Sequence, residues 1–314
     1  MTRPAVSQAV SEEPKPSRIL TIRKGKMVKP DRIVMTGTEG VGKSTFGASS
    51  PNPIFLSHED GIKHLDVQSF PDLETLEDVH QAIRDLLTTD HDRKTAVVDT
   101  VDWLEPILWA SLCKRNNWKH IEDAGYGKGY TIVLDEWRKF LADLDLLRNE
   151  RGMEIILISH TKIANFSNPS GPDYSRYEMS VNKQAAALLK QWADSVLFAC
   201  YEEMVTKEKG DMKAKGRETG ARVIHTERRA AWDAKNRYGL PAVLPLSYEE
   251  YAYHRDGGAA VATLAANLTA LLDELNPDKA LRGKIADFVG DCTDPNKLAQ
   301  AINRVRALLQ EKKP

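Results

Sequence analysis

Residues 32–46 read RIVMTGTEGVGKSTF, a short apolar run followed at once by a glycine-rich turn and the triplet Lys43-Ser44-Thr45. The spacing Gly-x-x-x-x-Gly-Lys-Ser is typical of a phosphate-binding loop. Glycines let backbone N–H groups approach phosphate oxygens, and a helix that begins near Lys43 turns its positive end towards them. Lys43 supplies a charge for the β- and γ-phosphates, while the Ser44 hydroxyl is suited to Mg²⁺. The stretch predicts a nucleoside triphosphate site made of Gly37, Thr38, Glu39, Gly40, Val41, Gly42, Lys43, Ser44 and Thr45.

Glu39 is an unexpected residue for a loop that binds phosphate. Its carboxylate would repel the phosphates at close range. We therefore expect the side chain to point away from the nucleotide, towards a basic partner or a neighbouring subunit.

Short apolar runs alternate with helical patterns over most of the chain. The runs cover residues 53–57, 95–98, 154–159, 195–201 and 222–226. The helical patterns cover residues 73–87, 103–148 with a break at 125–129, and 182–192. Continuous apolar runs between helices are typical of a parallel sheet that is covered on both faces. We therefore expect an α/β fold, with a long polar loop at residues 163–180 and a solvated hairpin tip at 207–217.

The composition sets limits on the class of protein. The chain has 314 residues, 41% of them hydrophobic, and a formal net charge of -1. This balance excludes a general attraction to nucleic acid, so any such contact must come from local patches. Cys113, Cys200 and Cys292 are scattered without metal-ligand spacing, which predicts reduced, buried thiols. No apolar run is long enough to cross a membrane and the first residues do not resemble a signal peptide, so we expect a cytoplasmic protein without a membrane partner.

The composition also predicts three parts. Residues 1–17 are rich in Pro, Ser and charge and favour a disordered arm. Residues 18–255 would form the nucleotide-binding core, and residues 256–314 a helical module with leucines at helical spacing. Residues 19–22 favour a short strand, which would either complete the chain's own sheet or add to the edge of a neighbour's sheet.

Polar residues at the ends of the apolar runs are candidates for catalysis. Asp99 directly follows a run and is suited to hold a Mg²⁺-bound water, with Asp102 as a rival beyond the strand end. Glu59 is a candidate to accept a proton from the attacking water, with Asp60 as the alternative. His160 would lie within reach of a γ-phosphate and report the phosphate state to the segment that follows it.

The absence of a guanine-reading motif at the strand ends predicts which base the nucleotide carries. A guanine-reading site calls for an Asn-Lys-x-Asp motif, whereas residues 234–237 read AKNR, without the aspartate. ATP is therefore the expected nucleotide, with Mg²⁺ held by Ser44 and Asp99.

Four segments, in this order, resemble the core of the RecA family of recombinases over roughly residues 30–245. FLSHEDGIK at 55–63 is similar to the strand that ends in the family's water-activating glutamate, which implies that role for Glu59. TAVVDTVDWLEP at 95–106 is similar to the Walker B strand, which implies the metal-site role for Asp99. ILISHTK at 156–162, the loop after it and residues 183–198 resemble the sensor strand and the second DNA-binding loop. The family's sensor is usually glutamine, so His160 departs from the pattern.

The fourth segment is AKNRYGLP at 234–241. It is similar to the segment whose two basic residues reach the ATP of the neighbouring subunit in a filament. The resemblance implies that Lys235 and Arg237 act in trans, with arginine in place of the family's second lysine. The chain resembles small phage-encoded RecA-like ATPases, recombinases that act with single-strand annealing and binding proteins, which implies the cytoplasm of a bacterial host as its location.

Two loops are candidates for contact with single-stranded DNA. Both interleave aromatic residues with glycines and basic residues, a composition that suits stacking on unpaired bases while charges follow the phosphates. The candidate residues are Tyr126, Lys128 and Tyr130 in the first loop and Phe166, Tyr174, Arg176 and Tyr177 in the second.

The sequence thus predicts a DNA-stimulated ATPase that assembles on single-stranded DNA in phage-type recombination or annealing. Two alternatives stay open. One is a ring-forming DNA motor, such as a helicase or packaging ATPase. The other is a nucleotide switch that binds a protein partner instead of DNA.

Overall fold

The computed structural model describes residues 29–58, 60–71, 73–206, 215–275, 283, 297–298 and 300–305. Its centre is one sheet with the strand order β3-β2-β4-β5-β1-β7-β8-β9, and β6 pairs with β5 beside this path. The strands are β1 (Arg32–Gly37), β2 (Pro53–Leu56), β3 (Gln68–Ser69), β4 (Thr95–Asp99), β5 (Glu154–Phe166), β6 (Tyr174–Met179), β7 (Ser195–Thr206), β8 (Lys215–His225) and β9 (Val243–Pro245). The strands from β3 to β7 along this path are parallel, β8 is antiparallel to β7, and β9 is antiparallel to β8. The expected α/β class with a mostly parallel sheet is confirmed.

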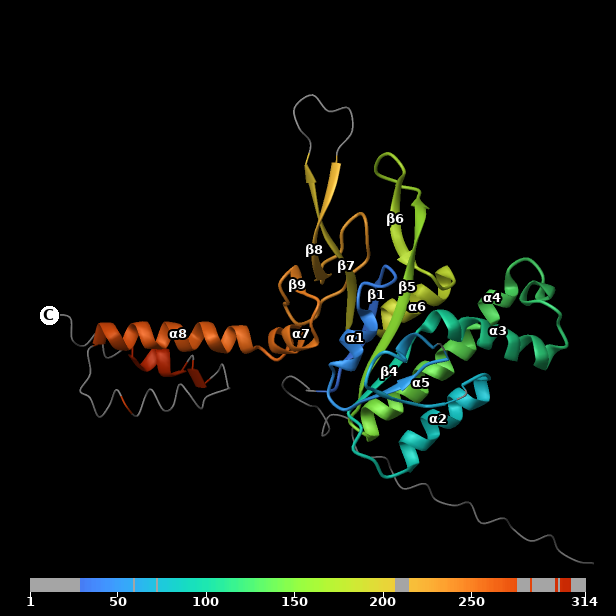
Figure 1. The fold of residues 1–314 in the computed structure, drawn as a ribbon, viewed down its shortest axis with the longest axis horizontal. Coiled ribbons are helices and arrows are strands. Elements are labelled where there is room, and N and C mark those ends of the chain that lie inside the picture. The colour runs from blue at the N-terminus through green and yellow to red at the C-terminus, as the bar shows by residue number, and fades with distance from the viewer. Residues whose placement is uncertain are drawn as a thin grey trace, which may run out of the picture.

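Helices cover both faces of the sheet (Figure 1). They are α1 (Lys43–Ala48), α2 (Leu76–Thr88), α3 (Val101–Asn116), α4 (Lys128–Ile132), α5 (Leu134–Glu150), α6 (Lys183–Trp192), α7 (Tyr248–Arg255) and α8 (Gly258–Leu275), with short 3₁₀ turns at Asp60–Ile62 and Ile121–Ala124. Side chains next to some helices cap their free backbone N–H groups and fix where the helix begins. At α2, for example, the Thr75 hydroxyl accepts from the Asp78 N–H and the Asp78 carboxylate accepts from the Thr75 N–H, which forms a capping box.

The side chains of the apolar strands contribute to two hydrophobic cores, one on each face of the sheet, because successive side chains point to opposite faces. In β5, Ile155 and Leu157 join the core under α2, α3, α5 and α6, while Ile156 and Ile158 join the core that contains Phe46 of α1 and Tyr251 of α7. This division explains why the strands read as continuous apolar runs, and it places β1 between the two cores, with Phe46 of α1 in the second of them.

Two hairpins project from the sheet on either side of β1 (Figure 1). Gly37, at the end of β1, pairs with His160 of β5 and with Ala199 of β7, yet β5 continues to Phe166 and β7 to Thr206. At ~3.3 Å per residue each strand overshoots the end of β1 by about 20 Å. The extended strands pair with β6 and β8 respectively.

The predicted long loop at residues 163–180 is therefore wrong. Most of that segment is the hairpin β5–β6, in register from Thr161 opposite Met179 to Phe166 opposite Tyr174. The prediction failed because the hairpin is largely solvated, so its strands carry Asn, Ser and Lys instead of an apolar run. For the same reason His160 does not end its strand but marks where β5 leaves the core.

The expected hairpin around residues 207–217 is confirmed at its base, where β7 pairs with β8. Its tip at 207–214, the predicted arm at 1–17 and the predicted strand at 19–22 lie outside the described residues.

The leucine stripe near the C-terminus lies on α8, which extends away from the sheet (Figure 1). Leu268 and Leu272 form a small apolar cluster with Leu298, Ile302 and Val305. The remainder of the two predicted C-terminal helices lies outside the described residues, and the domain limits at 17 and 255 stay predictions. Cys113 and Cys200 are reduced and half-buried, which is less burial than expected. No described helix combines the length and apolar character that crossing a membrane would need.

Candidate nucleotide-binding site

The phosphate-binding loop connects β1 to α1 at the carboxyl edge of the sheet. Gly40 and Gly42 have φ angles of 70° and 110°, in the left-handed region that favours glycine. Gly37 is required for a different reason, because a Cβ atom there would lie 2.3 Å from the carbonyl oxygen of Ala199. The glycines predicted from the sequence therefore serve two needs, the turn of the loop and the close approach of β7.

Lys43 is the buried cation of this loop, with 5% of its surface exposed. Its Nζ donates to the carbonyl oxygens of Gly37 at 2.9 Å and Thr38 at 2.8 Å. Burial lowers the pKa of Lys43, and nearby carboxylates oppose that shift. Those carboxylates belong to Asp99, Asp102 and Glu39.

Glu39 is exposed, and its charge acts on both Lys43 and His160. Its orientation relative to a bound nucleotide stays a prediction.

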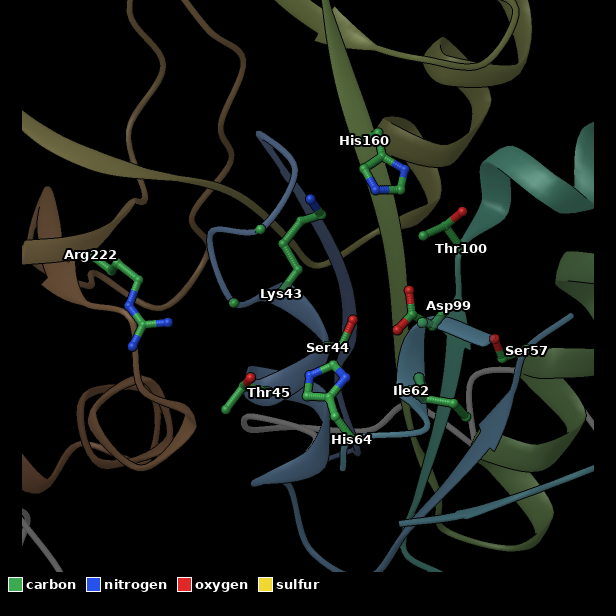
Figure 2. Close-up of a pocket in the computed structure, with 13 residues that line it drawn as sticks. Lys43, Ser44, Thr45, Ser57, Ile62, His64, Asp99, Thr100, His160 and Arg222 are labelled. Carbon is green, nitrogen blue, oxygen red and sulfur yellow. The ribbon is translucent and has the colours of Figure 1, made fainter. Parts of the chain in front are cut away.

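A cavity of about 350 Å³ opens over the loop (Figure 2). It is lined by Gly40, Gly42, Lys43, Ser44, Thr45, Ser57, Gly61, Ile62, His64, Asp99, Thr100, His160 and Arg222. Predicted residues from three separate stretches of sequence, the loop at 37–45, Asp99 and His160, are therefore brought to one place by the parallel strands, whose carboxyl ends meet at this edge.

The donor set of the cavity fits a nucleoside triphosphate with Mg²⁺. Gly40 and Gly42 leave the loop backbone accessible, and Lys43 offers a charge beside it. Asp99, at the end of β4, is 7% exposed, and Figure 2 shows its carboxylate on the same side of Lys43 as the Ser44 hydroxyl. A carboxylate and a hydroxyl are oxygen ligands of the kind Mg²⁺ takes when it also binds phosphates. When bound, the ion would neutralise charge on the β- and γ-phosphates.

Asp102 holds the end of the β5 core segment. Its carboxylate accepts from the backbone N–H of His160 at 2.8 Å and from the Ser159 hydroxyl at 3.1 Å, and it lies 3.4 Å from Nδ1 of His160. Burial alone would raise the pKa of Asp102, but the hydrogen bonds from His160 outweigh it and the pKa is lowered. The hydrogen bond to Asp102 in turn raises the pKa of His160. Asp102 therefore positions His160, and Asp99 is the carboxylate that lines the cavity.

The family comparison agrees with this geometry. A family model described as an AAA domain matches residues 29–238, more than half of the chain. The chain belongs to this family of AAA domains. A comparison with curated proteins found no match. The crystal structure of the RadB recombinase is similar with a TM-score of 0.38 and 13% identity, over 71% of this chain and 90% of that chain.

The AAA domain assignment makes the loop at residues 37–45 that of a P-loop ATPase. Glu59, the predicted acceptor of the water proton, lies outside the described residues. Its alternative Asp60 begins the 3₁₀ turn Asp60–Ile62, and Gly61 and Ile62 of that turn line the cavity. The role of Glu59 stays a prediction.

Lys235 and Arg237 do not line the cavity of their own AAA domain. The Lys235 ammonium donates to three carbonyl oxygens at the end of α6, and Arg237 pairs with Asp194 at 2.9 Å while 53% of its side chain is exposed. Those three oxygens belong to Lys190, Gln191 and Ala193. Action in a neighbour's site stays a prediction for both residues, and Arg237 is the one with an exposed side chain.

The candidate DNA-binding residues fall into two groups. Tyr126 is fully exposed at the tip of its loop, and Phe166 and Tyr174 face each other near the tip of the β5–β6 hairpin with ring centroids 5.2 Å apart. The others make contacts within the chain. Tyr130 packs on Trp109 and its hydroxyl donates to Glu122. Arg176 is 4% exposed and pairs with Asp233, and Tyr177 packs on Phe198. Lys128, by contrast, is exposed at the start of α4. Contact with DNA stays a prediction for all of them.

Sequence reasoning missed Arg222 and His64 of the cavity, which carried no local signal. It also missed the role of Asp102, which was considered only as a rival of Asp99, although its spacing of three residues places it in the first turn of α3.

Replacing Asp102 by asparagine is expected to lower the pKa of His160. The raised pKa depends first on the hydrogen bond to the Asp102 carboxylate, which asparagine cannot provide as an anion. Because the folded pKa lies above the ordinary value of 6.5, the pair stabilises the fold below that value and loses its effect as pH rises through the folded pKa. NMR titration of the His160 ring measures the change. The control Asp143→Asn removes a carboxylate from His80 instead and should leave the His160 titration unaltered; an unchanged titration in Asp102→Asn would contradict the pairing.

Proposed function

We propose that this AAA domain is an ATPase that assembles head to tail on single-stranded DNA, in phage-type homologous recombination or annealing. ATP binds at residues 37–45, with Mg²⁺ on Ser44 and, through water, on Asp99. Glu59 orients the attacking water. Lys235 and Arg237 complete the site of the neighbouring subunit.

One observation supports the coupling of nucleotide to DNA. Strand β5 passes without interruption from His160, which lines the cavity, to Phe166 near the tip of the hairpin. A paired strand transmits a shift along its axis better than an irregular loop would, because its ladder hydrogen bonds fix the register. His160 therefore links the phosphate end of the site to the aromatic pair Phe166 and Tyr174.

The aromatic pair is suited to unpaired bases. Phe166 and Tyr174 are half-buried, and the guanidinium of Arg176 lies 5.3 Å from the Phe166 ring centroid. Tyr126 offers a second, fully exposed ring on another loop. Stacking on such rings does not depend on base identity, which fits a protein that covers single strands of any sequence.

The test is DNA affinity in a variant that loses the aromatic pair. We expect the double change Phe166→Ser with Tyr174→Ser to weaken binding of a labelled single-stranded oligonucleotide roughly tenfold or more, as stacking on one ring is worth ~1–3 kcal/mol. Fluorescence anisotropy at one low salt concentration, with a non-hydrolysable ATP analogue, measures it. The control Tyr253→Ser removes an exposed tyrosine from α7.

The same preparation separates the alternatives. Wild-type protein whose hydrolysis is not stimulated by single-stranded DNA, and which does not bind it, would favour the switch that acts on a protein partner. Closed rings in electron micrographs would favour a DNA motor, and helical filaments the proposed assembly.

A further inference from the structure

Arg222 is a cation of the nucleotide cavity that no catalytic motif predicts. It lies on β8, opposite Tyr201 of β7, and lines the cavity together with Lys43. A Cβ atom placed on Gly42 would lie 3.0 Å from its Nη1 atom, so the guanidinium lies directly against the phosphate-binding loop. The side chain belongs to the same chain as the loop, unlike the predicted contributions of Lys235 and Arg237.

The guanidinium has no carboxylate or hydrogen-bond partner among the described residues. This sets it apart from four arginines that pack around the sheet and pair with carboxylates. Arg32 and Arg148 pair with Asp194, Arg176 pairs with Asp233, and Arg255 pairs with Glu154. A guanidinium presents a planar set of donors that matches phosphate oxygens, so Arg222 is chemically ready for an anion in the cavity.

The base of the β7–β8 hairpin holds Arg222 in place. The Tyr201 hydroxyl donates to the carbonyl oxygen of Gly40 at 3.3 Å, and the backbone N–H of Leu246 donates to the Arg222 carbonyl at 2.9 Å. Strand β7 is thus tied to the loop, and β8 is tied to Leu246, whose side chain also lies beside Gly42. The Arg222 side chain starts from a fixed backbone position and needs only rotamer changes to reach a ligand.

The position of Arg222 also indicates which part of a nucleotide it would meet. Figure 2 shows Asp99 on one side of Lys43 and Arg222 on the other, with Thr45 on the Arg222 side. Ser44 and Asp99 mark the metal, and therefore the β- and γ-phosphates, while the loop backbone holds the α- and β-phosphates. Arg222 consequently lies towards the nucleoside end of the phosphate chain.

We propose that Arg222 binds the phosphate nearest the nucleoside of a nucleotide held on its own chain's loop, an inference that rests on nucleotide binding as proposed above. ATP and ADP share this phosphate, so Arg222 contributes to the binding of both and does not distinguish between them. It also connects any bound nucleotide to the base of the β7–β8 hairpin.

Calorimetric titration of the full chain with Mg·ATP and Mg·ADP, without DNA, tests the proposal. We expect Arg222→Gln to weaken both nucleotides by a similar factor, roughly tenfold, which corresponds to one charge-assisted hydrogen bond partly screened by solvent. Arg222→Lys should recover part of the loss. In steady state, KM rises while kcat stays within about twofold, because the contact is the same before and during the reaction. The control Arg138→Gln removes an exposed arginine that pairs with Asp135 on α5 and should leave both affinities unchanged.

Three outcomes would overturn the proposal. Unchanged affinities in Arg222→Gln would remove the contact and leave the proposed function intact. A loss confined to ATP would place Arg222 at the γ-phosphate instead. Recovery of affinity when Arg222→Gln protein is mixed with Lys43→Ala protein would show that the arginine acts in trans. Wild-type protein that binds neither nucleotide would instead overturn the proposed function, and this inference with it.

Discussion

Lys43→Ala protein is expected to lose ATP hydrolysis by roughly 10²–10³-fold, the effect of removing one buried group that stabilises charge in a transition state. Lys43 is 5% exposed and directed into the loop, where its Nζ holds the carbonyl oxygens of Gly37 and Thr38. Alanine removes the charge for the β- and γ-phosphates and also the contact that shapes the loop. Release of phosphate from ATP, measured at saturating nucleotide, gives the rate.

The controls for this prediction separate chemistry from folding. Lys43→Arg keeps a positive charge, but its planar fork suits the pair of carbonyls less well, so we expect partial activity. Lys139→Ala removes a lysine from a pair with Glu136 on α5 and should hydrolyse ATP like the wild type. The melting temperature of Lys43→Ala is expected to stay close to that of the wild type, because the loop lies at the edge of the sheet, outside both cores. Hydrolysis by Lys43→Ala at the wild-type rate would refute the assigned site.

The nucleotide site could be predicted from the sequence because its parts are local. The glycines, Lys43 and Ser44 are close together in the sequence, between β1 and the first turn of α1. Asp99 is the last residue of the apolar strand β4. A parallel sheet then brings every strand end to the same edge, whatever the order of the strands. Such a motif can be recognised in the sequence because its residues are adjacent along the chain and do not depend on which strands pair.

The hairpins could not be predicted in the same way. Residues 163–180 form strands because β5 continues beyond the edge of β1 and finds β6 as a partner, which is a matter of pairing and not of apolar pattern. Arg222 reaches the loop through the register of β8 against β7, and a shift of one residue would turn it to the other face. The role of Asp102 could not be predicted because it depends on a hydrogen bond from His160, which is 58 residues away in the sequence and lies on strand β5.

Arg237→Gln is the second change with a large expected effect, and it tests the proposed assembly. We expect ATP hydrolysis by the assembled protein to fall roughly 10³-fold while nucleotide affinity is retained, as for an arginine supplied in trans. Arg237 suits this test better than Lys235, because Lys235 holds the three carbonyls at the end of α6. Asp194 would still pair with Arg32 and Arg148 after Arg237 is replaced, so the fold should persist.

A mixing experiment decides whether Arg237 serves its own site or a neighbour's. Arg237→Gln and Lys43→Ala proteins should each be inactive alone. In an equal mixture about one quarter of head-to-tail interfaces would combine an intact loop with an intact arginine, and hydrolysis should recover in that proportion. Arg222→Gln serves as the contrasting case for nucleotide affinity, since a binding group supplied by the same chain is not restored by a partner. Failure of the mixture to recover activity would place Arg237 in the structural cluster around Asp194, and the site would then be complete within one chain.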